Sequence, residues 1–113
     1  MGWIGVEMAK PTTGRTARRE AGPERTHGVF AISVAAEMTS LQVQNLRVYE
    51  RRGLLAPQRS EGGTRLYSRA DIDTLHRIRD LLADGLNIAG IARVLALEAE
   101  VTRLRARLER AEG

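Results

Sequence analysis

The residues best suited to chemistry in this chain are the polar and basic side chains between positions 42 and 67. A short basic segment ends at Gly53, and further along the chain Arg59 and Arg65 flank the pair Gly62-Gly63. Arginine can form two hydrogen bonds with the edge of guanine, and asparagine or glutamine can do the same with adenine. Arginine and tyrosine also suit phosphate oxygens, which fix a protein on a duplex without reading its sequence. This order of residue types favours a helix that enters a DNA groove, followed by a small β-hairpin that contacts the backbone beside it.

The net charge of +4 is unevenly distributed along the 113 residues. Residues 1–28 and residues 29–68 each carry five basic and three acidic groups, whereas residues 69–113 carry eight of each. The excess positive charge therefore lies in the first two segments, and it favours a polyanionic partner, most often nucleic acid. An arginine-rich surface that contacts only solvent is the alternative.

The sequence argues against an enzyme and against a metal or redox site. It contains no cysteine, which excludes disulfides, thiolate metal sites and thiol redox switches. His76 stands alone on a mostly polar stretch, and His27 lies near the N-terminus, so neither predicts a metal or catalytic group. No set of nucleophile, base and orienting group is visible, and Gly62-Gly63 does not open a helix as a phosphate-binding loop does. We therefore expect no enzymatic activity and no cofactor.

The sequence also argues against a membrane protein. No apolar run approaches the ~20 residues that a membrane span needs, and the N-terminus lacks the apolar core of a signal peptide. We expect a soluble cytoplasmic protein that is associated with the nucleoid.

Composition and periodicity divide the chain into three segments. Residues 1–28 show no apolar period and predict a disordered basic tail. Residues 29–93 predict a compact DNA-binding domain that begins with two short helices joined by a tight turn. Ser33 is the expected N-cap of the first helix, and the second is expected over residues 42–52, with Gly53 as its stop. Two such helices make a helix-turn-helix.

A hairpin and two further helices complete the expected domain. Residues 57–59 and 65–67 are the candidate strands, and Gly62-Gly63 supplies the positive φ of the turn between them. Ser68, with Asp71 as its capping-box partner, predicts the start of a third helix, and Asn87 predicts the start of a fourth. The buried face of the third helix is expected to consist of Ile72, Leu75, Ile78 and Leu82.

Residues 94–113 predict a coiled-coil helix. Apolar residues follow one another at alternating intervals of three and four, the spacing of a coiled-coil seam: Val94, Leu97, Val101, Leu104, Leu108 and Ala111. Acidic residues lie near the start of this segment and arginines near its end, so an antiparallel pair would place opposite charges together. We therefore expect dimerisation through Val94, Leu97, Val101, Leu104 and Leu108, with the two helices antiparallel.

A longer pattern points to a family. It consists of Leu46-Arg47-Val48-Tyr49-Glu50, Gly53-Leu54-Leu55-Ala56-Pro57, Arg59, Gly62-Gly63, Arg65-Leu66-Tyr67 and Asp71-Ile72. With these residues, the segment 29–111 resembles the MerR family of bacterial transcription regulators. Residues 30–36 and 86–91 are similar to the heat-shock repressor subgroup of that family.

The resemblance implies a mostly α fold, a winged helix-turn-helix DNA-binding domain with a C-terminal dimerisation coiled-coil helix. It implies that the protein binds a palindromic operator as a homodimer. It also implies that this homodimer represses heat-shock and chaperone genes, with a chaperone of the Hsp70 class as co-repressor. It also implies contacts with bases or nearby phosphates by Gln42, Gln44, Asn45 and Arg47. Contacts with the DNA backbone are implied for Tyr49, Arg59, Arg65 and Tyr67.

Several of these residues have a second interpretation. Gln42 could only cap its helix, Tyr49 could be a core aromatic residue, and Arg47 could be a surface residue paired with a neighbour. Arg51 and Arg52 are more typical of solvated residues that complement the dipole at a helix end. For the whole chain, the alternative is a protein-binding adaptor that modulates a chaperone without reading DNA.

Overall fold

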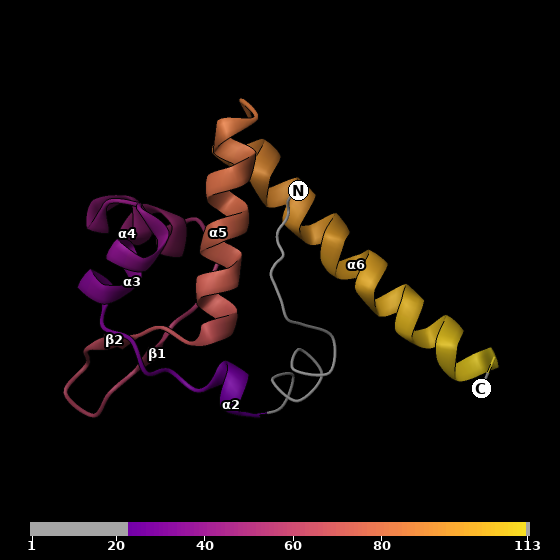
Figure 1. Cartoon of the computed structure of the whole chain (residues 1–113), viewed down its shortest axis with the longest axis horizontal. Coiled ribbons are helices and arrows are strands. Elements are labelled where there is room, and N and C mark those ends of the chain that lie inside the picture. The colour runs from indigo at the N-terminus through magenta and orange to yellow at the C-terminus, as the bar shows by residue number, and fades with distance from the viewer. Residues whose placement is uncertain (1–22, 113) are drawn as a thin grey trace.

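Helix α5 is the central element of residues 23–112, which the computed structural model describes, and the other elements lie around it (Figure 1). Helices α3 and α4 lie on one side of α5, the β-hairpin lies near its N-terminal end, and α6 leaves from its C-terminal end. Residues 1–22, most of the expected tail, lie outside the described residues. The elements in chain order are α2 (Pro23–Thr26), α3 (Ile32–Thr39), α4 (Val43–Arg51), β1 (Gln58–Arg59), β2 (Arg65–Leu66), α5 (Arg69–Ala83) and α6 (Ile88–Glu112).

The apolar core forms where α3 and α4 pack against α5. Ala35 of α3, Leu46 of α4 and Leu75 of α5 are all fully buried. The buried row of α5 is Ile72, Leu75, Ile78 and Leu81. The expected Leu82 is only partly buried at the edge of the core, because the row continues at intervals of three residues.

The turn between α3 and α4 is held by backbone hydrogen bonds. Ser40 adopts the left-handed conformation with a φ of 57°, and its N–H donates to carbonyl groups of the last turn of α3. The guanidinium of Arg79 in α5 donates to the carbonyl oxygen of Thr39 at 3.0 Å. Gly53, with a φ of 78°, follows α4 at the expected stop. Backbone hydrogen bonds therefore hold the turn of the helix-turn-helix, and Arg79 also attaches this turn to α5.

Helix α3 begins earlier than the sequence suggested. Its N-cap is Ala31, which makes no side-chain capping bond, and Ser33 is exposed within the first turn. The predicted Ser33 cap is wrong, because Phe30 pairs with Tyr67 in a β-bridge and so fixes the direction of the chain before residue 33.

Strands β1 and β2 form an antiparallel hairpin, which we call the wing (residues 57–67). Gln58 pairs with Leu66, and Arg59 pairs with Arg65. Of the two turn glycines only Gly63 has a positive φ, at 87°. The Ser60 N–H donates to the Thr64 carbonyl at 2.8 Å and closes the loop.

Residues 23–28 pack on the domain, although we expected them to belong to the tail. Arg25 of α2 forms an ion pair with Asp73 of α5. Gly28 is buried, and its N–H donates to Oε1 of Gln58 at 2.8 Å. Because both partners lie far along the sequence, the local composition gave no signal for this docking.

Local capping determines where the last two helices begin. Ser68 and Asp71 form the predicted capping box, with both hydrogen bonds at 3.0 Å. Asn87 accepts a hydrogen bond from the Gly90 N–H at 2.8 Å. From Ile88, α6 continues without interruption to Glu112, so the boundary expected between residues 93 and 94 lies inside one helix.

Candidate nucleic-acid interface

Helix α4 has an apolar face on the core and a polar face in solvent. Leu46 is fully buried and Tyr49 is 3% exposed, and together they anchor the helix against the domain. Residues three and four apart lie on the same side of a helix, so the opposite side carries a row of exposed polar residues. Gln44, Arg47 and Arg51 follow one another on that side at intervals of three and four, and the exposed Asn45 lies beside them; we call these four residues the polar face of α4.

The structure places two residues at the ends of α4, the N-cap Gln42 and the last residue Arg51. Gln42 occupies the N-cap position with extended backbone, but its side chain makes no capping hydrogen bond and is exposed. It is therefore free to contact a ligand at the start of α4. Arg51 is exposed in the last turn of α4, in agreement with its interpretation as a solvated helix-end residue, and it also lies one turn beyond Arg47 on the polar face. The interval of four residues between the two arginines is the signal that could have identified it.

Glu50 connects the wing to α4. Its carboxylate forms ion pairs with two arginines, one on each strand of the wing: Arg65, and Arg59 at 3.2 Å. The Glu50 side chain is only 19% exposed, and the hydrogen bond from Arg65 raises the pKa of the Arg65 guanidinium. The wing is thus held beside the polar face of α4 by a three-residue charge cluster.

The two wing arginines are not equivalent. The Arg59 side chain is 49% exposed, and one of its nitrogens also donates to the Gly63 carbonyl at 2.9 Å. The Arg65 side chain is 27% exposed and faces Glu50. Arg59 is therefore the wing residue whose charge is more available to a polyanion, while Arg65 mainly joins the wing to α4.

The two tyrosines expected to contact the DNA backbone belong to the core. Tyr67 is fully buried and Tyr49 is 3% exposed. Burial raises the pKa of both phenols, and nearby Glu50 adds to the effect on Tyr67. The Tyr67 hydroxyl has no hydrogen-bond partner among the described residues. The burial favours the core interpretation given above for Tyr49 and indicates a core position for Tyr67 as well, while the contacts of their hydroxyl groups with the DNA backbone stay predictions.

The distal part of α6 exposes a row of apolar side chains. Leu97, Val101, Leu104 and Leu108 are between 43% and 64% exposed. Val94, the first residue of the expected seam, is half-buried against the core of its own domain. We call the four exposed residues the apolar row of α6.

Other kinds of site are not apparent in the described part of the chain. Residues 23–112 contain no group of three or more histidine, aspartate or glutamate side chains placed to hold a metal ion. None of the described helices is long and apolar enough to cross a membrane.

Comparisons with known proteins agree with this geometry. Residues 30–98 match the family model described as MerR HTH family regulatory protein. A Streptomyces coelicolor protein named as heat shock protein HspR is 46% identical over 80 residues, which cover 70% of this chain and 53% of that protein. The HTH-type transcriptional regulator GlnR of Bacillus anthracis is 40% identical over 78 residues, covering 69% of this chain and 60% of GlnR.

A solved structure shares the fold. HiNmlR, described as a MerR family regulator that lacks the sensor domain and is bound to promoter DNA, superposes with a TM-score of 0.59 and 26% identity. The match covers 74% of this chain and 64% of HiNmlR. These likenesses confirm the predicted fold class. The chain spans 53% to 60% of the length of the two curated relatives above.

Proposed function

Because the chain belongs to the MerR family of helix-turn-helix regulatory proteins, we propose that it binds double-stranded DNA as a homodimer and represses heat-shock genes. The relatives reported above are transcription regulators, which is a non-enzymatic role. Repression of heat-shock genes is inferred from the similarity to HspR. The co-repressor of the Hsp70 class stays a prediction, since no described residue points to it.

The observation that supports DNA binding is the polar face of α4 beside the wing. Amide and guanidinium groups in this row are the donors and acceptors that read base edges in the major groove. Arg59 lies on the neighbouring wing, where its exposed guanidinium suits a backbone phosphate. In this proposal Gln42, Gln44, Asn45 and Arg47 face the bases or nearby phosphates, Arg51 extends their row, and Arg65 holds the wing in position.

The apolar row of α6 supports a dimer. Four large exposed apolar side chains on one helix leave surface in water that a second copy of the helix would cover. Glu98 and Glu100 precede four arginines along α6, namely Arg103, Arg105, Arg107 and Arg110. An antiparallel arrangement sets the acidic end of one helix against the basic end of the other. Two copies of α4 would then read half-sites about one turn of DNA apart, ~34–36 Å, or a multiple of it.

A protein-binding adaptor on the same fold is the competing function. The polar face of α4 carries two arginines and two amides and no acidic residue. Such a surface complements a polyanion better than it complements the basic face of another protein. DNA binding is therefore the function that the geometry supports best.

Replacing Arg47 tests this proposal. The purified protein would first select duplexes from a random library, and fluorescence anisotropy would then measure the affinity of the selected sequence. We expect Arg47→Ala to weaken binding by ~1–3 kcal/mol and to relax specificity at one base pair, because the arginine reads a base edge.

Arg93→Ala is the matched control, since it removes one exposed positive charge from the proximal part of α6, outside the polar face of α4 and the wing. We expect this variant to keep the sequence preference. If the wild-type protein bound no duplex better than random competitor at moderate salt, DNA reading would be refuted and the adaptor favoured.

A further inference from the structure

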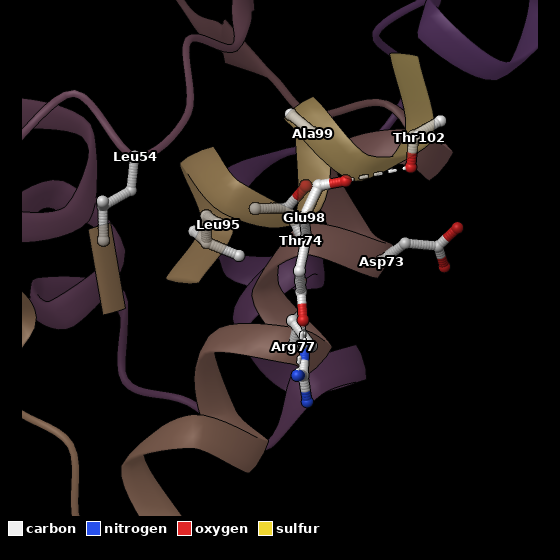
Figure 2. Close-up of a pocket in the computed structure, with 8 residues that line it drawn as sticks. All are labelled: Leu54, Asp73, Thr74, Arg77, Leu95, Glu98, Ala99 and Thr102. Carbon is white, nitrogen blue, oxygen red and sulfur yellow. Dashed lines mark hydrogen bonds and ion pairs between the residues drawn. The ribbon is translucent and has the colours of Figure 1, made fainter. Parts of the chain in front are cut away.

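Helices α5 and α6 meet at the turn formed by residues 84–87 and then diverge (Figure 1). Close to the turn the joint is apolar, with Ile91 fully buried and Val94 and Leu95 packed against the core. Farther from the turn an open groove of about 400 Å³ is lined by residues of α5 and α6 together with Leu54 (Figure 2). Apolar packing therefore fixes only the base of the long helix.

Arg77 of α5 and Glu98 of α6 join the two helices across this groove (Figure 2). Arg77 Nε lies 2.9 Å from Oε2 and 3.2 Å from Oε1 of Glu98, and Nη2 lies 2.5 Å from Oε2. Among the side-chain hydrogen bonds and ion pairs found within residues 23–112, this is the contact that connects α5 with α6. The hydrogen bond to Glu98 raises the pKa of Arg77.

The exposure of this pair argues against a main role in stability. The two side chains are 42% and 44% exposed, and ion pairs in water contribute little to folding. A two-pronged guanidinium–carboxylate contact does, however, fix the relative orientation of its two groups. At this place the two groups belong to α5 and α6, so their relative orientation bears on the angle between the two helices.

We propose that the Arg77–Glu98 pair is a positioning element that sets the angle of α6 relative to the DNA-binding domain, and thereby the half-site separation that the dimer accepts. The inference rests on the proposed function, because it assumes that α6 pairs with a second copy and that α4 reads DNA. It adds a determinant of spacing that lies outside the DNA-contacting surface.

The length of α6 makes a small change of angle consequential. The ~15 residues from its start to the middle of the apolar row span roughly 22 Å. A tilt of ~10° at the joint would displace that point by roughly 4 Å, whereas one base-pair step is about 3.4 Å. Loss of the Arg77–Glu98 ion pair would thus allow the two α4 helices of the dimer to lie at separations that differ by about one base pair.

A distance measurement without DNA tests the geometric part. The chain has no cysteine, so Ser33→Cys on the exposed side of α3 gives one spin-label site per protomer. Pulsed electron paramagnetic resonance on the full-length protein then reports the separation of the two DNA-binding domains. We expect a narrow distribution for the wild-type background and a distribution broadened or shifted by several Å for Arg77→Ala and for Glu98→Gln.

A binding measurement tests the effect on spacing. Duplexes would carry the selected half-sites at the wild-type separation and at separations one and two base pairs shorter or longer. We expect Arg77→Ala and Glu98→Gln to reduce the preference for the wild-type separation about tenfold. The exchanged pair, Arg77→Glu with Glu98→Arg, should restore most of it. Arg93→Ala is the matched control, since it removes an exposed arginine of α6 that lies outside the apolar row and leaves the α5–α6 contact intact.

The two measurements separate failure of this inference from failure of the proposed function. Unchanged distances and unchanged spacing preference in both single variants would overturn the positioning role, while DNA binding would stand. If the exchanged pair restored neither the distances nor the spacing preference, the effect of the single variants could not be attributed to the contact between these two side chains. If no duplex were bound, the proposed function and the spacing role would both fall, and the distance measurement would still decide whether the pair fixes the angle.

Discussion

Glu50 shows how one residue can support the proposed DNA interface without belonging to the surface that would face DNA. It lies on α4 between the buried face and the polar face, and its carboxylate holds one arginine from each strand of the wing. A negative charge this close to phosphates would oppose binding if it were unpaired. Because two guanidinium groups surround it, the cluster keeps a positive balance and fixes the wing beside α4.

The two buried phenols predict a loss of stability in alkaline solution. Burial raises the pKa of Tyr49 and Tyr67 in the folded state above that in the unfolded chain. Above pH ~10 the unfolded chain therefore binds fewer protons than the folded protein, and the free energy of unfolding falls as the pH rises through the folded-state pKa values. We expect the melting temperature to fall in this range, with tyrosinate absorbance appearing together with unfolding.

The chain has two tyrosines, Tyr49 and Tyr67, so replacing one of them separates its contribution to the alkaline loss of stability from that of the other. In Tyr67→Phe the Tyr49 phenol is left to titrate, so the alkaline loss should become smaller. The same variant removes a buried hydroxyl that has no partner in the described structure, and it should be neutral or stabilising at neutral pH. Tyrosinate absorbance that appeared at the ordinary pKa in a protein still folded by circular dichroism would contradict the burial of these side chains.

The sequence identified the residue types of the interface better than their environments. Gln44, Asn45 and Arg47 are exposed as expected, because the helical period of about 100° per residue turns all three away from Leu46. Tyr67 could not be placed in this way, since an aromatic residue beside a wing arginine fits both a phosphate contact and the core. Its burial depends on pairing with Phe30, far earlier in the chain.

At the scale of elements, the segment 28–30 joins the end of the wing through an isolated antiparallel β-bridge between Phe30 and Tyr67. The N–H groups of Val29 and Phe30 both donate to the Tyr67 carbonyl at 2.9 Å, and the Tyr67 N–H donates to the Phe30 carbonyl at 2.7 Å. A two-stranded hairpin is marginal in water by itself. The wing is therefore stabilised by the first residues of the domain, and by Gly28 just before them, which composition assigned to the tail.

Gly28→Ala tests this arrangement. A Cβ at residue 28 would lie 2.6 Å from the carbonyl oxygen of Leu66, a backbone atom that cannot rotate away. We expect the added methyl group to lower the free energy of unfolding by ~1–3 kcal/mol, the usual cost of overpacking. Urea denaturation followed by circular dichroism would measure the change.

Gly62→Ala is the matched control for that substitution. Its Cβ would find its nearest heavy atom at 4.0 Å, and Gly62 does not have a positive φ. Stability should therefore change little. Equal stability of the two variants would show that the segment preceding Val29 does not dock on the wing.

Elements whose ends are fixed by neighbours in sequence were the predictable ones. The Ser68–Asp71 capping box and the Asn87 cap each join residues three positions apart, so the pattern alone indicates them. The start of α3 is fixed by the bridge between Phe30 and Tyr67, and no local pattern could reveal that. The same limit explains why α2 and its ion pair with Asp73 were missed.

At the scale of the whole molecule, a compact DNA-binding domain carries one long projecting helix (Figure 1). The domain buries its apolar residues internally, whereas the distal half of α6 does not. The period of this helix predicted the apolar row. The antiparallel dimer remains a prediction, and it implies a loss of association free energy when a residue of the apolar row is replaced.

Leu104→Asp tests the dimer. Burying one leucine side chain is worth ~1.5–3 kcal/mol, and a symmetric dimer would bury two copies of Leu104. The expected loss of ~3–6 kcal/mol corresponds to association at least ~100-fold weaker. Sedimentation should then show a particle of the chain mass of 12.5 kDa where the wild-type protein sediments at twice that value.

Ala106→Asp is the control, because residues 104 and 106 lie about 200° apart around the helix and the same new carboxylate then faces away from the apolar row. This variant should remain dimeric. Loss of the dimer should also abolish discrimination between a palindrome and a single half-site, since each domain would then bind alone. A Leu104→Asp protein that still sedimented as a dimer would show that the apolar row is not the interface, and the half-site spacing would need another origin.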